Sequence, residues 1–61
     1  MANLTEKELS ALEDQLHLEQ TLIKKHKGYA ALAQDPQIRT MCDQLAGRHK
    51  QHFDTLMGHL Q

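Results

Sequence analysis

Glu19, His49 and His52 are the residues of this sequence whose types and spacing best fit metal chemistry. The two histidines are three residues apart, so on a helix both imidazoles project from one face. Imidazole nitrogens bind Zn, Fe, Ni or Cu, while a carboxylate supplies negative charge and can chelate or bridge. If the glutamate lies level with the histidine pair, the three side chains predict a site for a divalent cation, with Fe or Zn as the candidates.

Two helix-start signals define the elements that would position these side chains. Thr5 and Glu8 fit a capping box, in which the threonine oxygen accepts from a backbone amide and the glutamate reaches back to the threonine amide. Asp35 followed by Pro36 is typical of a second helix start, because aspartate caps free amides and proline lacks only an amide that would be unpaired. The sequence is therefore all-α, with a first helix that ends before this second signal.

We expect the helices to span about 5–33 and 36–60 within one domain, 1–61, although Gly28 and Gly47 are points where they could kink. The connection is so short that the helices must fold back as an antiparallel hairpin. Residues at equal height then have numbers that sum to about 69, since both helices rise uniformly. Glu19 consequently faces residue 50, between His49 and His52.

The apolar pattern is wider than one neighbouring helix can cover, because a flanking stripe accompanies the three-four seam of each helix. A chain of 61 residues with the single cysteine Cys42 has neither a large core nor a disulfide to stabilise it. We therefore expect two hairpins to form a homodimer closed into a four-helix bundle. The expected dimer core consists of Leu12, Leu16, Ile23, Leu45, Phe53 and Leu56.

In an antiparallel dimer the two-fold axis would bring a second copy of Glu19, His49 and His52 to the same central layer. The alternative to a metal is a polar layer, dry or bridged by water, that fixes the register of the bundle. His26 falls near Cys42, so a second thiolate-imidazole site is a weaker candidate, because a buried free cysteine usually behaves as a small hydrophobe. The remaining histidines and the lysine cluster receive no function; these residues are His17, His59, Lys24, Lys25 and Lys27.

Charge and hydropathy argue against several classes of partner. Seven Lys and Arg against eight Asp and Glu give a formal charge of -1, which disfavours binding to nucleic acid and to membrane surfaces. No apolar run approaches the roughly 20 residues of a membrane-spanning helix. The start of the chain shows no signal-peptide pattern, so we expect an intracellular location.

From Leu16 to Leu56 the sequence resembles the spore coat protein F family of endospore-forming bacteria, which belongs with the ferritin-like helical bundles. The resemblance is carried by Glu19, by Asp35-Pro36-Gln37-Ile38-Arg39 at the turn, and by His49-Lys50-Gln51-His52-Phe53 in the second helix. It implies a ferritin-like four-helix bundle, a spore coat location and spore coat proteins as partners. In di-iron members of the ferritin-like group the second helix carries Glu-x-x-His, and His49 stands here in place of that glutamate.

Two functions from different classes follow. The first is a structural, non-enzymatic assembly module that acts as a homodimer. The second is a metal-binding bundle, with iron oxidation as its candidate reaction, that uses Glu19, His49 and His52 from both subunits. A helix-turn-helix nucleic-acid binder is disfavoured because the connection is close to a straight reversal and the charge is slightly acidic.

Overall fold

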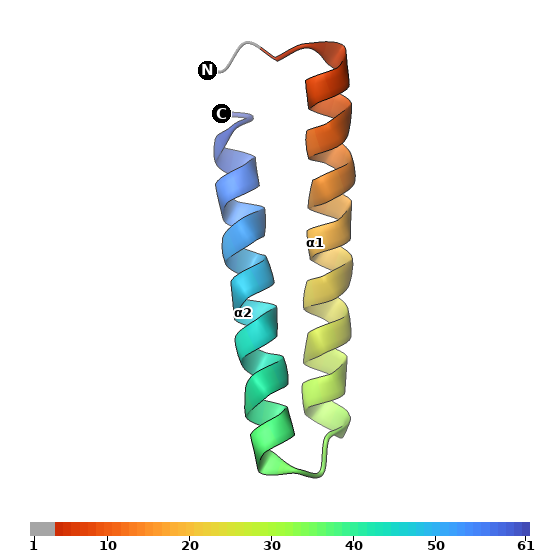
Figure 1. Ribbon diagram of the computed structural model, residues 1–61, viewed down its shortest axis with the longest axis vertical. Coiled ribbons are helices and arrows are strands. Elements are labelled where there is room, and N and C mark those ends of the chain that lie inside the picture. Colours follow the sequence, from red (N-terminus) through yellow and green to blue (C-terminus); the bar gives the residue numbers. More distant parts are fainter. Residues whose placement is uncertain (1–3) are drawn as a thin grey trace.

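A computed structural model describes residues 4–61, so the first three residues of the predicted domain lie outside the described part. Helix α1 spans Glu6–Leu32 and helix α2 spans Pro36–Gly58. The helices pack against each other side by side, and the chain reverses between them, so that the start of α1 and the end of α2 lie at the same end of the molecule (Figure 1). The predicted helical hairpin is therefore confirmed, as an elongated body with extents of 46 × 15 × 10 Å.

The capping box predicted at the start of α1 is present. The Glu8 backbone N–H donates to Thr5 Oγ1 at 3.1 Å, and the Thr5 backbone N–H donates to Glu8 Oε1 at 3.1 Å. The hydrogen bond from the Thr5 backbone N–H, most strongly, and the Thr5 side-chain hydroxyl hold the pKa of the Glu8 carboxyl below its ordinary value of 4.5. Two of the amides that a helix start leaves without intrahelical partners are thus satisfied by the sequence itself.

The tight connection is fixed by the second predicted cap. The Gln37 backbone N–H donates to Asp35 Oδ1 at 2.8 Å, and Pro36 occupies the first helical turn. Arg39 Nη2 donates to the Ala33 carbonyl oxygen at 2.8 Å and ties the end of α1 to the start of α2. Because the connection is short and is held by these two hydrogen bonds, the two helices can pack only antiparallel.

The ends of the helices differ slightly from those predicted. Thr5 and Ala33 are the caps of α1 rather than its first and last residues. Helix α2 ends at Gly58, two residues before the predicted end, because the next two amides, those of His59 and Leu60, bond three residues back in a tighter turn. Both helices continue through the glycines at which kinks were considered, and no glycine of the described residues has a positive φ.

Very little of this hairpin is buried. Among the described residues, only Glu19, Ala30 and Ala46 are buried, and none has a side chain that is large, apolar and fully enclosed. The six residues expected in the dimer core each lie half-buried along the seam between the helices: Leu12, Leu16, Ile23, Leu45, Phe53 and Leu56. Their remaining surface is open in the single hairpin.

The exposed area of the hairpin is correspondingly large. Its surface measures 4925 Å², whereas a compact monomer of 7.0 kDa is expected to expose about 4,000 Å². The excess of about 900 Å² includes large apolar side chains that are more than a third exposed: Leu9, Leu18, Tyr29, Leu32, Ile38 and Met41. Neither described helix combines the length and the apolar character needed to cross a membrane.

Candidate metal centre

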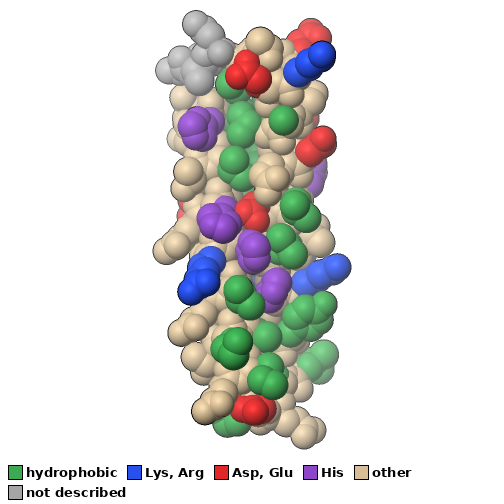
Figure 2. All heavy atoms as spheres, viewed as in Figure 1, with side chains coloured by type: hydrophobic (Ala, Val, Ile, Leu, Met, Phe, Trp, Pro, Cys, Tyr) green, Lys and Arg blue, Asp and Glu red, His purple; other side chains and the backbone are tan. Residues whose placement is uncertain are grey.

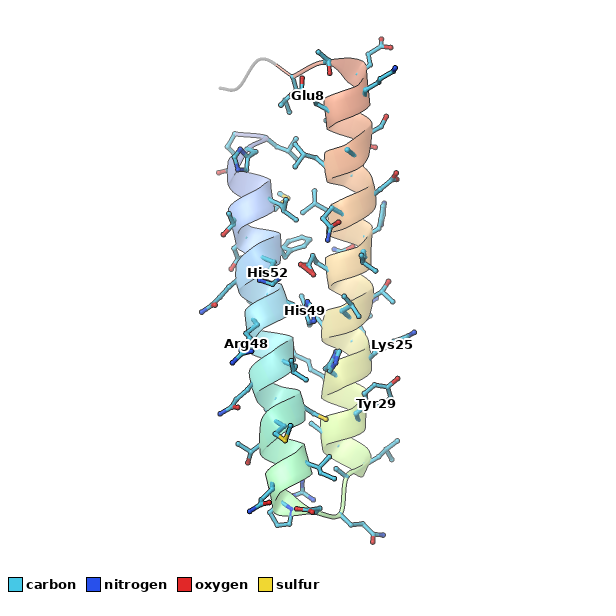
Figure 3. The ribbon with its side chains drawn as sticks, viewed as in Figure 1. Glu8, Lys25, Tyr29, Arg48, His49 and His52 are labelled. Atoms are coloured by element: carbon cyan, nitrogen blue, oxygen red, sulfur yellow. The ribbon has the colours of Figure 1, made fainter. Side chains whose placement is uncertain are left out.

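Glu19 lies near the middle of α1 and points at α2, where it is 97% removed from solvent, with a relative exposure of 3%. Each of its two carboxylate oxygens accepts one hydrogen bond from α2. His49 Nδ1 donates to Oε1 at 2.8 Å, and His52 Nδ1 donates to Oε2 at 3.0 Å. Figure 3 shows both imidazoles projecting from α2 toward the gap between the helices at this level. We call these three residues the Glu19 triad.

The triad forms because the three side chains come from one level of two antiparallel helices. A spacing of three residues puts His49 and His52 on one face of α2, one turn apart. The single carboxylate lies between them, and each of its oxygens accepts a hydrogen bond from one ring. The structure therefore brings together, within one chain, the three residues that the sequence predicts as ligands.

Protonation in the triad follows from what each group can donate. An ionised carboxylate only accepts hydrogen bonds, so both Nδ1 atoms carry a hydrogen. In a neutral imidazole the other ring nitrogen, Nε2, then holds a lone pair. The rings differ in exposure, because the side chain of His49 is 20% exposed and that of His52 is 61% exposed.

The environment makes the carboxylate the least solvated polar group of the hairpin. A buried carboxylate is costly unless it is hydrogen-bonded or paired, and here two donors compensate it. Within residues 4–61, no buried side-chain nitrogen or oxygen lacks a hydrogen-bond partner. The centre of the hairpin is thus a satisfied polar layer between apolar half-buried layers.

A third histidine lies beside the triad. The ring centroids of His26 and His49 are 5.4 Å apart, and those of His49 and His52 are 5.7 Å apart. His26 Nδ1 donates to the Leu22 carbonyl oxygen at 2.7 Å, so His26 does not share the carboxylate. Sequence reasoning placed His26 near the half-buried Cys42 and missed its neighbour His49, although both histidines occupy seam positions.

The donor set fits a borderline divalent cation. One ligand atom from each residue of the Glu19 triad lies within 4.8 Å of the others, so the group could hold a metal ion. Ligands around Zn²⁺ sit about 2.0–2.2 Å from the ion, which places them roughly 3.4 Å from one another in a tetrahedron. The present Nδ1–oxygen distances of 2.8 and 3.0 Å would need to open by about half an ångström while the Nδ1 hydrogens leave.

Other polar residues considered from the sequence lie apart from this group. His17 and His59 are exposed, as are Lys24, Lys25 and Lys27, and none is part of the Glu19 triad. His49 occupies the position at which the resemblance to di-iron proteins would require a second glutamate. The triad therefore contains one carboxylate, and it lacks the set of bridging carboxylates that two ferric ions need for charge balance. No protein-family model, curated protein or solved structure matches the chain.

Proposed function

We infer that this chain is a self-associating structural module, in which two hairpins close into a homodimeric four-helix bundle whose outer surfaces contact other proteins. The observation that carries this proposal is the apolar surface that the hairpin leaves uncovered. The surface beyond that of a compact monomer, about 900 Å² of polar and apolar atoms together, is close to the roughly 800 Å² that each partner buries in a standard interface. The seam residues remain half-buried, as expected for helices that need a second layer.

Much of the uncovered apolar surface lies on the face of the molecule that Figure 2 shows. Figure 2 shows hydrophobic side chains along the boundary between the helices and over the half nearest the turn, with histidines across the middle of the same face. We call this side the open face. Contiguous apolar patches of this kind on a small protein usually mark an interaction site.

Solution mass provides the first test. Light scattering coupled to size-exclusion chromatography should give about twice the 7.0 kDa subunit mass. A substitution on the open face should shift the dimer to monomer: Met41→Glu adds a charge where the hairpin alone leaves the side chain 59% exposed. Thr40→Glu adds the same charge at the neighbouring exposed position, about 100° around α2 from Met41, and serves as the matched control.

These two variants separate the dimer from an isolated hairpin. A stable hairpin monomer would tolerate both charges equally, because both positions are solvated in it. A dimer should lose at least tenfold in affinity with Met41→Glu and little with Thr40→Glu. A monomeric wild-type protein would refute the proposal.

A spore coat role for the module rests on the resemblance of the turn and second-helix motifs. It predicts that, in an endospore-forming bacterium that encodes the chain, a fluorescent fusion collects at the forespore surface. The dimer would supply rigid helix surfaces to other coat proteins, and it would catalyse no reaction. A fusion that stays diffuse throughout sporulation would contradict the coat role and leave the dimer untouched.

A second candidate function, favoured by the geometry of the Glu19 triad, is binding of a divalent cation such as Zn²⁺ or Fe²⁺. Elemental analysis of untagged protein should find metal that is lost in Glu19→Ala and His49→Ala. His17→Ala removes an exposed histidine outside the triad and should keep the metal. Equal metal content in all the variants would indicate adventitious binding and would overturn this candidate.

A further inference from the structure

We propose that the two hairpins pack with their open faces together in antiparallel orientation, so that the apolar end near each turn fills a groove at the open end of the partner. This inference rests on the proposed dimer. It adds the direction of packing and the residues that meet across the two-fold axis, and it identifies the occupant of the groove as a second copy of this chain.

The half of the open face near the turn protrudes. Tyr29 and Leu32 on α1, and Ile38 and Met41 on α2, are all at least half exposed. Each pair is separated by three residues, so its members project from one side of their helix. These four apolar side chains have no cover within the hairpin.

The other half of the open face is hollowed. A shallow groove of about 370 Å³ lies beside the ends of the chain and is lined by the apolar residues Leu4, Ala11, Leu12 and Leu56 together with polar residues that include His59. A second hollow of about 310 Å³ shares Leu56 and Gln15 with it and reaches Glu19 and His52. A continuous concave strip therefore runs from the chain ends to the Glu19 triad.

Helical spacing puts the protruding and hollowed halves on the same side. Ala11 and Tyr29 are 18 residues apart, which is about five whole turns of α1. Met41 and His59 are also 18 residues apart, again about five whole turns of α2. A groove residue and a protruding residue thus share one direction on each helix.

A single two-fold axis satisfies both helices at once. The midpoint between Ala11 and Tyr29 is residue 20, and the midpoint between Met41 and His59 is residue 50. These two midpoints lie at the level of the Glu19 triad, where His49 and the carboxylate meet. We place the two-fold axis at that level, in the interface and perpendicular to the helices. The axis then puts Tyr29 opposite the partner's Ala11 and Met41 opposite the partner's His59.

Charge favours the same direction. Lys25 and Asp14 are exposed, and their 11-residue separation is about three turns, so they also share one side of α1. Their midpoint falls between residues 19 and 20, so the axis creates two symmetric pairs, in each of which Lys25 of one subunit lies opposite Asp14 of the other. Among residues 4–61, neither side chain forms an ion pair within the hairpin.

The parallel alternative is worse in shape. With the axis along the helices, turn would meet turn, so protruding side chains would collide while two grooves faced each other across a void. Helix α1 would then lie on α2 of the partner. Lys25 and the partner's Arg48 would be only about four residues apart in height, or roughly 6 Å along the axis. In the antiparallel arrangement the two copies of Arg48 differ in height by about the same distance, so repulsion at Arg48 does not distinguish the two directions.

Cross-linking of single-cysteine chains tests the direction. The background is Cys42→Ala, and each chain carries one added cysteine, Lys25→Cys, Asp14→Cys or Arg48→Cys, all at exposed positions. The chains are mixed in pairs, treated with a short bismaleimide and analysed by mass. Light scattering on each mixture establishes first that dimers are present.

Antiparallel packing predicts that the mixed cross-link between Lys25→Cys and Asp14→Cys forms in at least five times the yield of the mixed cross-link between Lys25→Cys and Arg48→Cys. Lys25→Cys alone and Asp14→Cys alone should each give little, because the two-fold copies of either position lie about 15–18 Å apart along the axis, whereas the two copies of Arg48→Cys lie about 6 Å apart and should cross-link to each other. The reverse ratio, or equal yields in a protein that scattering shows to be dimeric, would overturn the antiparallel interface and leave the dimer standing. Monomers in every mixture would refute the dimer and the interface together.

Discussion

The two hydrogen bonds to Glu19 should differ in strength although one carboxylate accepts both. His49 and His52 use the same ring atom on the same acceptor, and their distances of 2.8 and 3.0 Å are similar. Their surroundings differ, because the His49 side chain is 20% exposed and that of His52 is 61% exposed. Water therefore competes more effectively for the His52 hydrogen bond than for the one from His49.

This difference can be expressed as coupling energies from double-mutant cycles. Hydrogen bonds to charged groups contribute about 1.5–3 kcal/mol where they are shielded, and exposed ion pairs contribute about 0.2–1 kcal/mol. We expect a coupling of about 2 kcal/mol between Glu19 and His49, and of less than about 1 kcal/mol between Glu19 and His52. The exposed pair Lys50–Asp54, at 3.2 Å, is the internal control and should couple by about 0.3–0.5 kcal/mol.

The assay is urea unfolding of alanine variants, singly and in pairs, followed by circular dichroism. Chelator removes any metal, and all samples share one subunit concentration because association makes the apparent stability depend on concentration. A cycle cancels the cavity left by each truncation, so the coupling reports the pair itself. Equal couplings for the two histidines, or a larger one for His52, would refute the claim that burial sets the strength of these hydrogen bonds.

Four further predictions concern helix stability, the seam and the metal. Gly28→Ala and Gly47→Ala should each stabilise the fold by about 0.5–1 kcal/mol, because the added Cβ meets no atom within 4 Å; a lower urea midpoint in either variant would contradict this. The pKa of Glu8 is lowered from 4.5, so its contribution to stability is present above pH 4.5 and is lost as the pH falls through the lowered value. Glu8→Gln should therefore lose less stability than the wild-type protein as the pH falls below 4.5. Thermal melts above and below pH 4.5 that show the same loss of stability in both proteins would contradict this. Leu16→Asp places a charge in the half-buried seam and should cause unfolding and dissociation together, as judged by circular dichroism and light scattering; a folded monomer of this variant would count against the dimer. Any metal at the Glu19 triad should bind less tightly as the pH is lowered from neutral to about 5, because protons compete with it for the imidazole nitrogens; a metal affinity, titrated against a chelator, that stays constant over this range would argue against imidazole ligands.

The local signals of the sequence determined the elements. Thr5 and Glu8 start α1 through side-chain and backbone groups only three residues apart, and Asp35 with Pro36 starts α2 within a single turn. Interactions of such short range need no tertiary context, so caps, helix type and reversal could be read from the sequence. The last turn of α2 could not, because a fraying end has no capping residue to fix it.

The level of the Glu19 triad was also set by the sequence, through the position of the turn and the uniform rise of two helices. The contacts within that level were decided by the direction of the side chains. Side chains lean toward the N-terminus of their own helix, so in an antiparallel pair those of α1 and α2 lean toward each other along the axis. This lean brings His26 within 5.4 Å of His49, although their backbone heights differ by about six residues.

Only the tertiary structure decided how the polar atoms are shared and where the surface is open. The sequence predicts a carboxylate and two imidazoles at one level. Which carboxylate oxygen accepts from which Nδ1 depends on the side-chain rotamers, and these are set by packing across the seam. The groove beside Ala11 and Leu56 likewise arises from the spacing of two helices and the small side chains between them. Helical periodicity fixes which residues share a side, whereas depth and protrusion depend on how closely the two helices approach.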